Sequence, residues 1–337
     1  MQPNVNLVTI DNNIEKIKKL IQELVLEPRI KALEWSKITK QTPNMKIGYP
    51  GQHLASLVLG MEGCKTGARG NDIVDGSEVK SCSRVDASDK CKDCGEKLSR
   101  TEVVCCVCGS ENITRDNTSK WLFTIRDNND LKVLTEDLDR VVLVLADYPE
   151  FNSGNFDDIQ FQVFEIWNNT SRCIEFTNLM NNYYNNIYQV HKGNDSAKTP
   201  APKNFWPYSY QFYKCNPIRV FSCIVKNANV KPVIEDLFYI DPKEDRNSLS
   251  SELMPSNILS KDEVPALIEM LSAVPEDLLI NRLVQGKTIK DLAEVINAKS
   301  FSKTKFSQIL PYIDEELREY LPLRLDKTFV VKTKHKR

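Results

Sequence analysis

The sequence predicts an α/β protein with a mixed central β-sheet flanked by helices, an inserted four-cysteine zinc ribbon and a helical C-terminal domain. Three observations support this prediction. Strand-length runs of β-branched and aromatic residues occur in the middle of the chain, among segments with helical apolar spacing. Two Cys-x-x-Cys pairs stand ten residues apart. Beyond residue 243 the pattern changes to helical segments alone.

The predicted sheet combines a hairpin with three apolar runs, which together supply about five strands. These segments cover residues 72–82, 121–125, 141–146 and 159–167. Helices are expected from the apolar spacing at residues 12–33, 51–59 and 176–190. We expect the helices to flank the sheet and to complete a core domain over residues 1–242.

Composition limits the class of protein without deciding its function. The chain has 337 residues, of which 41% are hydrophobic and 27% are charged, as in a soluble globular protein of one large or two to three modest domains. It shows no long apolar run and no basic segment followed by an apolar one, so we expect neither a membrane span nor a secretion signal. A net charge of −1 argues against indiscriminate coating of nucleic acid. It is compatible with a sequence-specific enzyme whose acidic metal site offsets basic residues elsewhere.

The segment at residues 70–80 carries the most informative pattern in the chain. If its turn is a three-residue hairpin loop with Gly76 in the left-handed conformation, Asp72 faces Glu78 across the paired strands. Lys80 follows Glu78 by two residues, so both side chains project from the same face. Two facing carboxylates repel unless a cation lies between them. The pattern therefore predicts a magnesium site at which Asp72, Glu78 and Lys80 activate water, as in nucleases.

The same residue types also occur in proteins without an active site, and the choice of acid stays open. Asp75 is the alternative first carboxylate, although its position in the turn favours a structural role. Glu62, at the end of the helix expected at 51–59, is either an additional ligand or a solvent-facing residue. The flanking residues 67–70 are small and flexible, which suits close approach of a substrate backbone, and Arg69 among them is a candidate DNA contact.

The run Asp72…Glu78-Val79-Lys80 resembles the PD-(D/E)XK nuclease motif, with Asn71-Asp72 in place of the usual Pro-Asp. The short gap between the acids is similar to that of methyl-directed mismatch-repair nicking endonucleases and some type II restriction endonucleases. The segments 70–83 and 198–206 both resemble restriction endonuclease sequence, and the resemblance covers the middle of the chain. It implies a type II restriction endonuclease that cuts both strands of duplex DNA with Mg²⁺ held by Asp72 and Glu78. Because one site cuts one strand, it also implies a homodimer.

A four-cysteine cluster is the least ambiguous site in the sequence. Its predicted ligands are Cys91, Cys94, Cys105 and Cys108. Each pair presents two thiolates from one tight turn, and the following glycine relieves the left-handed backbone that completes the turn. Four sulfurs select Zn²⁺ in a closed, structural site with no position left for water. We place this zinc ribbon at about residues 84–118.

Cysteine spacing of this kind indicates metal rather than disulfides, which fits a reducing cytoplasm. The remaining thiols lack ligand spacing and are expected to be a bystander, Cys106, and ordinary buried residues: Cys64, Cys82, Cys173, Cys215 and Cys223.

Basic residues of the ribbon are candidate phosphate contacts, although any single one is better explained as surface charge: Arg84, Lys90, Lys92, Lys97 and Arg100. A segment at 198–216, rich in proline, aromatics and lysine, is expected to be a functional or tightly packed loop. Its candidate DNA contacts are Lys198, Lys203 and Asn204. Aromatic side chains at this density more often pack in a core than stack on bases.

A polar linker at 243–251 separates the core from a C-terminal helical domain over residues 243–337. Helices are expected at 264–271, 275–284, 288–296 and 302–310. The last two suggest either a helix-turn-helix, with Lys303 and Lys305 as DNA contacts, or an ordinary helical hairpin. The basic tail from residue 332 is expected to assist phosphate binding without specificity.

Two alternatives to the restriction enzyme remain at this stage. A repair or recombination nuclease would nick one strand or recognise DNA structure, and it would not cut intact DNA into discrete fragments. A non-catalytic zinc-containing DNA-binding regulator would use the ribbon and the C-terminal helices alone. The opposed acids and Lys80 argue against the regulator, because a pure binder gains nothing from carboxylates aimed at phosphate.

Overall fold

The computed structural model describes residues 1–43, 45–65, 71–168, 170, 174–194, 202–255, 258, 313, 315–318 and 321. The chain divides into two compact units. The first comprises residues 1–122, 138–167 and 218–250, and the second comprises residues 123–137, 168–217 and 251–337. The helices predicted between residues 264 and 310 and the basic tail lie outside the described residues, so the separate C-terminal domain stays a prediction.

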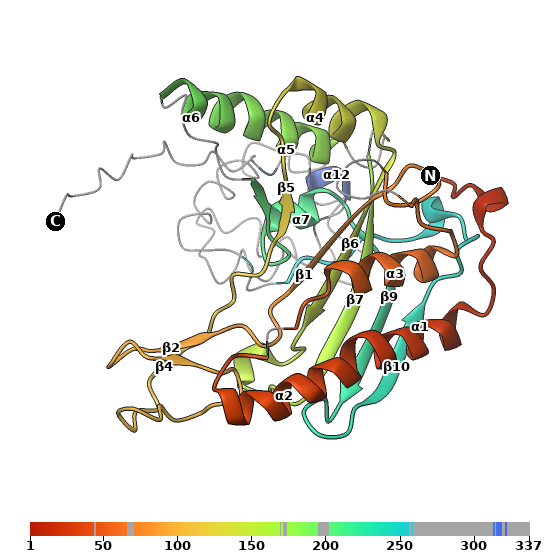
Figure 1. Ribbon diagram of the computed structural model, residues 1–337. Coiled ribbons are helices and arrows are strands. Elements are labelled where there is room, and N and C mark those ends of the chain that lie inside the picture. Colours follow the sequence, from red (N-terminus) through yellow and green to blue (C-terminus); the bar gives the residue numbers. More distant parts are fainter. Residues whose placement is uncertain are drawn as a thin grey trace, which may run out of the picture. The chain divides into compact units, whose positions relative to one another are not determined.

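The first unit is built on a five-stranded mixed sheet with the order β1-β6-β7-β9-β10 (Figure 1). Its strands are β1 (Glu78–Ser83), β6 (Arg140–Asp147), β7 (Ile159–Trp167), β9 (Ile218–Lys226) and β10 (Val233–Tyr239). Strands β1 and β6 run parallel, and every other neighbouring pair is antiparallel. The predicted mixed α/β class is confirmed, and two of the predicted apolar runs form the adjacent strands β6 and β7.

Helices from the start of the chain cover one face of this sheet (Figure 1). They are α1 (Asn13–Ile21), the π-helical segment η2 (Gln22–Leu26), α2 (Glu27–Thr39) and α3 (Gly48–Leu59). Buried side chains such as Ile17 and Leu54 share one hydrophobic core with Val142 and Val144 of β6. The apolar spacing predicted this amphipathic face, although the helical stretch continues beyond residue 33 to Thr39.

Helix α3 approaches β1 unusually closely. A Cβ atom at Gly51 would overlap Ser81 Oγ and would lie only 2.9 Å from Ser81 Cβ. Glycine is therefore required for the helix to pack at this distance from the strand. The close approach fixes the next helical residue, Gln52, above the start of β1.

The predicted hairpin at 72–82 is only partly right. The turn is present: the N–H groups of Asp72 and Ile73 both donate to the Ser77 carbonyl, at 3.1 and 3.2 Å, and Gly76 has a φ of 91°. The first arm, however, is not a strand paired with β1. Ile73 forms an isolated antiparallel bridge with Gly63, and the partner of β1 is the parallel strand β6. Long-range pairing with β6, which the local sequence does not encode, displaced the expected hairpin.

The second unit contains an aromatic core. Its elements include α4 (Asn128–Lys132), η3 (Val133–Asp137), α5 (Glu175–Tyr183), η5 (Tyr184–Tyr188), α6 (Gln189–Asn194), β8 (Lys203–Phe205), α7 (Tyr210–Lys214) and α12 (Glu315–Arg318). Strand β5 (Trp121–Phe123), which the sequence predicted as part of the central sheet, belongs instead to a separate two-stranded sheet with β8. The rings of Phe123 and Phe176 meet edge to face at 5.4 Å, and Phe205 lies 6.0 Å from Phe212. The helix predicted at 176–190 is confirmed as α5, η5 and α6.

Short 3-10 turns complete the described structure at η1 (Val5–Leu7), η4 (Phe151–Ser153) and η6 (Arg246–Ser248). Within the described part of the chain, none of the helices combines the length and the apolar character needed to cross a lipid bilayer.

Candidate functional site

The predicted acidic residues converge at the start of β1. Asp72 Oδ2 accepts the backbone N–H of Val79 at 2.8 Å, and Asp72 Oδ1 accepts the side-chain amide of Gln52 at 2.8 Å. The carboxylate of Asp72 is thus held against the residue that separates Glu78 from Lys80. Gln52 was not predicted, because nothing in the sequence of α3 indicates that this residue lies above the acidic turn.

Glu78 and Lys80 lie on the same face of β1 and form an ion pair, both partly buried, while Val79 between them belongs to the hydrophobic core. Burial raises the pKa of Glu78 above its ordinary value, Lys80 acts to lower it, and the charge of Asp72 raises it further. Because the pKa of Glu78 is raised overall, the attraction of Lys80 does not fully offset the cost of burying the negative charge of Glu78.

This donor set fits a divalent cation. Magnesium sites usually take one or two protein carboxylates and fill their remaining positions with water and substrate phosphate. Asp72 and Glu78 supply two carboxylates on adjoining backbone, and each oxygen of Asp72 already accepts one fixed donor and retains a further lone pair. A bound cation would relieve the charge that burial leaves uncompensated on Glu78.

The alternative acid, Asp75, has other partners. Its Oδ1 caps the turn by accepting the N–H of Ser77 at 3.1 Å, and its Oδ2 accepts Arg140 Nη2. The side chain of Asp75 is therefore engaged in the turn, which fits the structural role that the sequence favours. Glu62 is exposed, and its carbonyl accepts the N–H of Val74.

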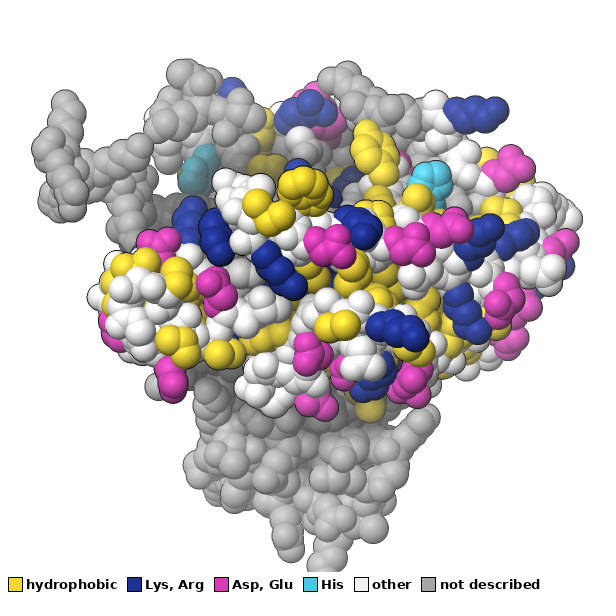
Figure 2. Space-filling view, turned by 60° about the horizontal axis from the view of Figure 1, so that its bottom comes forward, with side chains coloured by type: hydrophobic (Ala, Val, Ile, Leu, Met, Phe, Trp, Pro, Cys, Tyr) yellow, Lys and Arg dark blue, Asp and Glu magenta, His cyan; other side chains and the backbone are white. Residues whose placement is uncertain are grey.

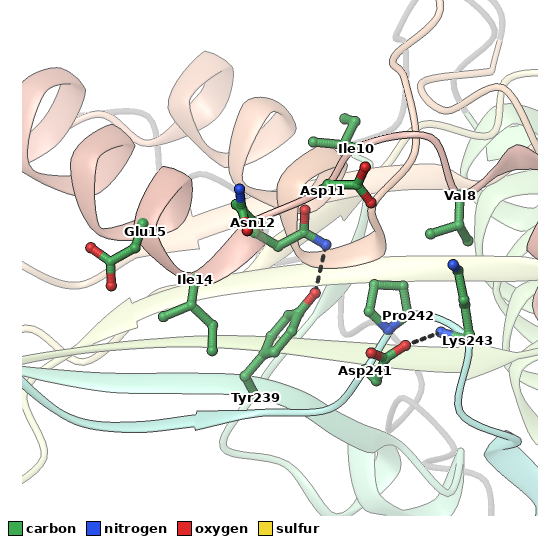
Figure 3. Close-up of a pocket in the computed structure, with 11 residues that line it drawn as sticks. Val8, Ile10, Asp11, Asn12, Ile14, Glu15, Tyr239, Asp241, Pro242 and Lys243 are labelled. Atoms are coloured by element: carbon green, nitrogen blue, oxygen red, sulfur yellow. Dashed lines mark hydrogen bonds between the residues drawn. The ribbon is translucent and has the colours of Figure 1, made fainter.

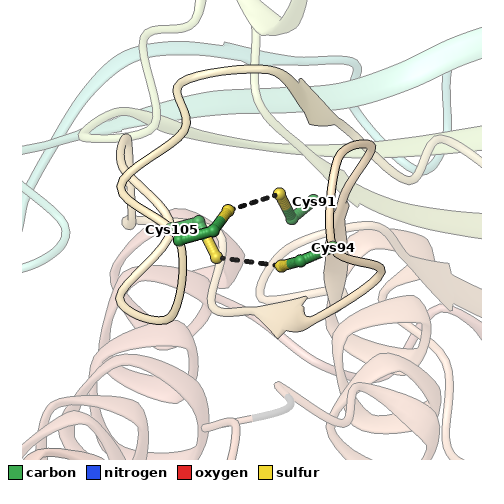
Figure 4. Close-up of side chains that lie close together, drawn as sticks. Cys91, Cys94 and Cys105 are labelled. Carbon is green, nitrogen blue, oxygen red and sulfur yellow. Dashed lines mark hydrogen bonds between the residues drawn. The ribbon is translucent and has the colours of Figure 1, made fainter.

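The four predicted zinc ligands come together in the segment after β1 (Figure 4). The sulfur atoms of Cys91, Cys94, Cys105 and Cys108 all lie within 4.8 Å of one another. The Sγ–Sγ distances are 3.6 Å for Cys91–Cys108 and 3.5 Å for Cys94–Cys105. Tetrahedral zinc with bonds of about 2.3 Å requires sulfurs about 3.8 Å apart, so the geometry fits this ion.

Both cysteine turns have the same local design. Gly95 N–H donates to the Cys91 carbonyl at 3.0 Å, and Gly109 N–H donates to the Cys105 carbonyl at 2.8 Å. Both glycines have positive φ, 80° and 71°, as the sequence predicts. A hydrogen bond from the Cys94 backbone lowers the pKa of Cys91 to about 7, whereas the pKa values of Cys94 and Cys108 are raised through hydrogen bonds with the neighbouring thiols, so without a metal the cluster favours only one thiolate among these three. The ribbon that carries the four cysteines contains the short strands β2 (Asp89–Cys91), β3 (Lys97–Leu98) and β4 (Ile113–Thr114).

A buried ion cluster stabilises this ribbon from within. Asp89 is fully buried and accepts Arg100 Nη1, Arg115 Nη1 at 2.7 Å and the backbone N–H of Asp116 at 2.9 Å. The Arg100 side chain is itself 0% exposed, so the suggestion that it contacts phosphate is wrong. Arg84 pairs with Asp147 and lies over the ring of Phe151. The DNA contact predicted for Arg84 stays a prediction and would require this ion pair to open.

The exposed surface of the ribbon is more apolar than basic (Figure 2). Val103 and Val107 are 67% and 66% exposed, and Val104 and Cys106 are exposed beside them. No lysine or arginine occurs between Thr101 and Asn112. Lys90, Lys92 and Lys97 are exposed and stay candidate phosphate contacts.

The remaining predicted DNA contacts divide into two groups. Arg69, Lys198, Lys303 and Lys305 lie outside the described residues. Lys203 is buried in β8, with its ammonium 5.8 Å from the ring of Tyr183, whereas Asn204 beside it is partly exposed. A phosphate contact by Lys203 would require its side chain to leave this position, and both contacts stay predictions.

The other cysteines behave largely as ordinary thiols. Cys82, Cys215 and Cys223 are buried, as expected, and burial raises the pKa of both Cys82 and Cys223 to about 12. Cys64 is partly exposed, and Cys173 lies outside the described residues.

A separate hollow of about 300 Å³ lies between the start of α1 and the end of β10 (Figure 3). Asn13 donates to the hydroxyl of Tyr239 at 2.7 Å in this hollow, and Asp11, Glu15 and Asp241 contribute carboxylates to its wall. Among the described residues only the four cysteines bring three or more ligand groups within reach of one ion, and these carboxylates do not.

An acidic pair with a lysine at one end of β1 and a four-cysteine ribbon beyond its other end, on a mixed α/β sheet, is the arrangement expected of a restriction endonuclease. The chain belongs to the MamI restriction endonuclease family, whose profile matches residues 34–257. One relative is the protein described as "Type II restriction enzyme MamI" from Microbacterium ammoniaphilum, which is 30% identical over 83 residues. That match spans 25% of this chain and 27% of the relative. No solved structure matches the chain.

Proposed function

We propose that this protein is a Mg²⁺-dependent, site-specific endonuclease that hydrolyses phosphodiester bonds in both strands of duplex DNA. The observation that carries the proposal is the convergence of Asp72, Glu78 and Lys80 at the start of β1. Membership of a restriction endonuclease family and the similarity to a type II restriction enzyme support the same reaction.

In this proposal Asp72 and Glu78 hold the cation. When bound, Mg²⁺ lowers the pKa of a coordinated water and neutralises charge on the scissile phosphate. A water oxygen bonds to phosphorus while the P–O3′ bond breaks, which yields a 5′-phosphate and, after protonation of the leaving oxygen, a 3′-hydroxyl.

Lys80 has two tasks in the reaction. Its ammonium pairs with Glu78 in the absence of substrate. When phosphate approaches, three N–H donors are able to orient the attacking water and to stabilise the charge that grows on the phosphoryl oxygens. Such stabilisation is efficient because the strand already holds Lys80 beside the Glu78 carboxylate.

Gln52 and the backbone of Val79 keep the first carboxylate in place. Each donates to a different oxygen of Asp72, so the carboxylate cannot rotate freely. A carboxylate that is already held in place loses less entropy when the cation binds. Gln52 and the Val79 backbone therefore strengthen cation binding by fixing Asp72 in advance.

The zinc ribbon has a structural role in this proposal. Cys91, Cys94, Cys105 and Cys108 would fill all four positions of Zn²⁺, so no water could be activated there. The ion would rigidify a ribbon that lies beyond the end of β1 opposite to the acidic residues. Five residue steps separate Glu78 from Ser83, which corresponds to about 16 Å along a strand.

Cleavage of both strands requires two active sites, so we propose a homodimer with two-fold symmetry acting on duplex DNA. The described basic residues that remain free to contact phosphate on the ribbon are Lys90, Lys92 and Lys97.

The deciding experiment incubates the purified protein with unmethylated plasmid and Mg²⁺, then sequences the DNA ends. Discrete fragments with one recurrent sequence at their ends are expected. Nicked circles without linear product would instead indicate a single-strand nuclease. DNA binding without cleavage under all divalent cations would refute the enzyme and favour a zinc-containing regulator.

A further inference from the structure

Arg140, at the start of β6, occupies the centre of a buried network below the acidic turn. Its Nε donates to Ser77 Oγ at 2.9 Å, and its Nη2 donates to Asp75 Oδ2. Its Nη1 donates to Glu165 Oε1 at 3.1 Å. The guanidinium carbon also lies 4.9 Å from the centre of the Trp167 ring. All three guanidinium nitrogens and one face of the group therefore make contacts.

A second arginine holds the other half of the network in place. Arg246 donates to both oxygens of Glu165, at 3.1 and 3.2 Å, and Trp167 Nε1 donates to Glu165 Oε2 at 2.7 Å. Burial opposes the charge of Glu165, yet Arg140 and Arg246 lower its pKa below the ordinary value. Glu165 therefore stays ionised and fixes the direction in which Arg140 points.

Arg140 contacts the turn at two residues, one on each side of Gly76, which has a positive φ. Asp75 and Ser77 stand immediately on either side of Gly76, and the Ser77 carbonyl accepts the N–H groups of Asp72 and Ile73. Glu78 follows Ser77 directly. The conformation of this turn thus sets the distance between the carboxylates of Asp72 and Glu78.

We propose that Arg140 is a positioning residue, which clamps the Asp75–Ser77 turn so that Asp72 and Glu78 are spaced to hold one divalent cation. The inference rests on the proposed function of these two acids. Arg140 does not touch the cation or the DNA, and it acts only through Asp75 and Ser77. Its loss widens the spread of carboxylate positions, and the cost appears chiefly in the affinity for Mg²⁺.

The test measures plasmid cleavage by the full chain as a function of Mg²⁺ concentration. Asp75→Asn removes the acceptor for Arg140 while the remaining side-chain oxygen is still able to cap Ser77. Arg140→Lys keeps the charge but replaces three separate nitrogens in a planar group with a single ammonium, which cannot reach Ser77, Asp75 and Glu165 together in this geometry. Both variants are expected to raise the Mg²⁺ concentration for half-maximal cleavage about tenfold, and saturating Mg²⁺ should restore most of kcat.

Asp158→Asn is the matched control. Asp158 pairs with Lys226 at 2.8 Å, and its side chain is 15% exposed, against 13% for Asp75. Loss of this ion pair should change stability to a similar degree and leave the Mg²⁺ dependence unchanged. Thermal unfolding of all variants separates a general loss of folded protein from a specific loss of cation affinity.

A double variant strengthens the test. If Arg140 acts through Asp75, the combined Arg140→Lys, Asp75→Asn change should raise the Mg²⁺ requirement no more than the larger single change. Independent, multiplicative effects would contradict the clamp. Because Asp75→Asn preserves the volume of a partly exposed side chain, it keeps the inference testable even if Arg140→Lys does not fold.

The outcomes distinguish this inference from the function on which it rests. An active Glu78→Gln variant would overturn the proposed site and the clamp together. An inactive Glu78→Gln variant with wild-type Mg²⁺ dependence in Asp75→Asn and Arg140→Lys would overturn the clamp alone. Complete loss of cleavage in Asp75→Asn at every Mg²⁺ concentration, with activity retained in Asp72→Asn, would identify Asp75 as a ligand and likewise exclude the clamp.

Discussion

Asp72 accepts the backbone N–H of Val79 at 2.8 Å, so its carboxylate is anchored to the peptide between Glu78 and Lys80. Substitutions at Val79 other than proline keep this donor, because it belongs to the backbone. The contact ties the Asp72 carboxylate to the backbone of β1, on which Glu78 and Lys80 also lie. Preorganisation of this kind is what an active site for charged substrates needs.

The first prediction concerns the three residues themselves. Asp72→Asn, Glu78→Gln and Lys80→Met should each lower the cleavage rate by at least about a hundredfold, because they remove a cation ligand or the water-orienting amine. DNA affinity measured with Ca²⁺ in place of Mg²⁺ should change less than the rate for Lys80→Met, which leaves both carboxylates intact. Single-turnover cleavage and gel-shift titrations give the two quantities.

Glu62→Gln is the control for this series. Glu62 is an exposed acid close to the same turn in sequence, and we expect wild-type cleavage after its substitution. Wild-type activity in the Glu78 variant would remove the basis of the assignment. Activity in the Asp72 variant combined with inactivity in an Asp75 variant would reassign the first ligand.

The second prediction follows from the raised pKa of Glu78. A carboxyl whose pKa is higher in the folded chain than in the unfolded chain binds protons more tightly when folded, so its ionisation lowers stability as the pH rises. Without divalent cations at neutral pH, Glu78→Gln should therefore raise the Tm by roughly 2–4 °C, the shift that about 1 kcal/mol produces. Mg²⁺ should stabilise the wild type and should not stabilise the variant to the same extent.

The raised pKa of Glu78 also determines how the cleavage rate falls at low pH. Cleavage should fall as the pH drops through the raised pKa of Glu78, and a higher Mg²⁺ concentration should move this limb to lower pH because the cation competes with the proton. Calorimetry across pH and cleavage rates at two Mg²⁺ concentrations test both parts. An equal Tm in wild type and variant at all pH values would contradict the buried charge.

The third prediction uses the close packing of α3 on β1. Gly51→Ala places a Cβ against Ser81, next to Lys80, and should cost about 1–3 kcal/mol through overpacking as well as lowering the cleavage rate. Gly48→Ala in the same helix is the matched control, because its Cβ would meet no atom of the described residues within 4 Å. It should be neutral or slightly stabilising.

A compensating change sharpens this test. Ser81 Oγ has no hydrogen-bond partner within the described part of the chain, so Ser81→Ala should be nearly neutral alone and should recover part of the stability lost in Gly51→Ala. Urea denaturation of the four variants measures the coupling. A Gly51→Ala variant as stable as the wild type, or one that Ser81→Ala does not rescue at all, would show that contact with Ser81 does not determine the effect.

Local chemistry made part of this architecture predictable. The two Cys-x-x-Cys-Gly turns, the positive φ of Gly76 and the alternation of Glu78, Val79 and Lys80 all depend on neighbouring residues only. Sequence spacing therefore predicted them correctly. The apolar runs of β6 and β7 were equally clear, because strands buried along most of their length need continuous hydrophobic residues.

Long-range relationships were not predictable in the same way. The parallel pairing of β1 with β6 replaced an expected hairpin, and Gln52 reaches Asp72 only because α3 packs against β1. Arg100 is a charged residue of a kind usually found on the surface. It is nevertheless buried, because Asp89 balances its charge. An isolated basic residue carries no sequence signal of its distant carboxylate partner, which is why tertiary structure is needed to separate buried arginines from DNA contacts.

The last prediction concerns the metal in the ribbon. The protein should contain one zinc per chain, and a Cys94→Ser, Cys108→Ser double variant should lose it, because two of four thiolates are then missing. Residues 84–118 should become sensitive to protease before the sheet unfolds, since the hydrophobic cluster around the cysteines, formed by Cys91, Leu98, Cys105 and Ile113, is small and offers little support without the metal. Metal analysis and limited proteolysis followed by mass spectrometry measure both effects.

Cys106→Ser is the matched control for this experiment. Cys106 is exposed within the second cysteine turn and does not belong to the four-sulfur cluster, so its substitution should leave the zinc content and the protease pattern unchanged. Wild-type protein purified without chelators and found free of zinc would contradict a closed four-thiolate site. Zinc loss that abolishes sequence-specific DNA binding, while Mg²⁺-dependent nicking persists, would assign the ribbon a part in recognition, because the acidic site lies at the opposite end of β1.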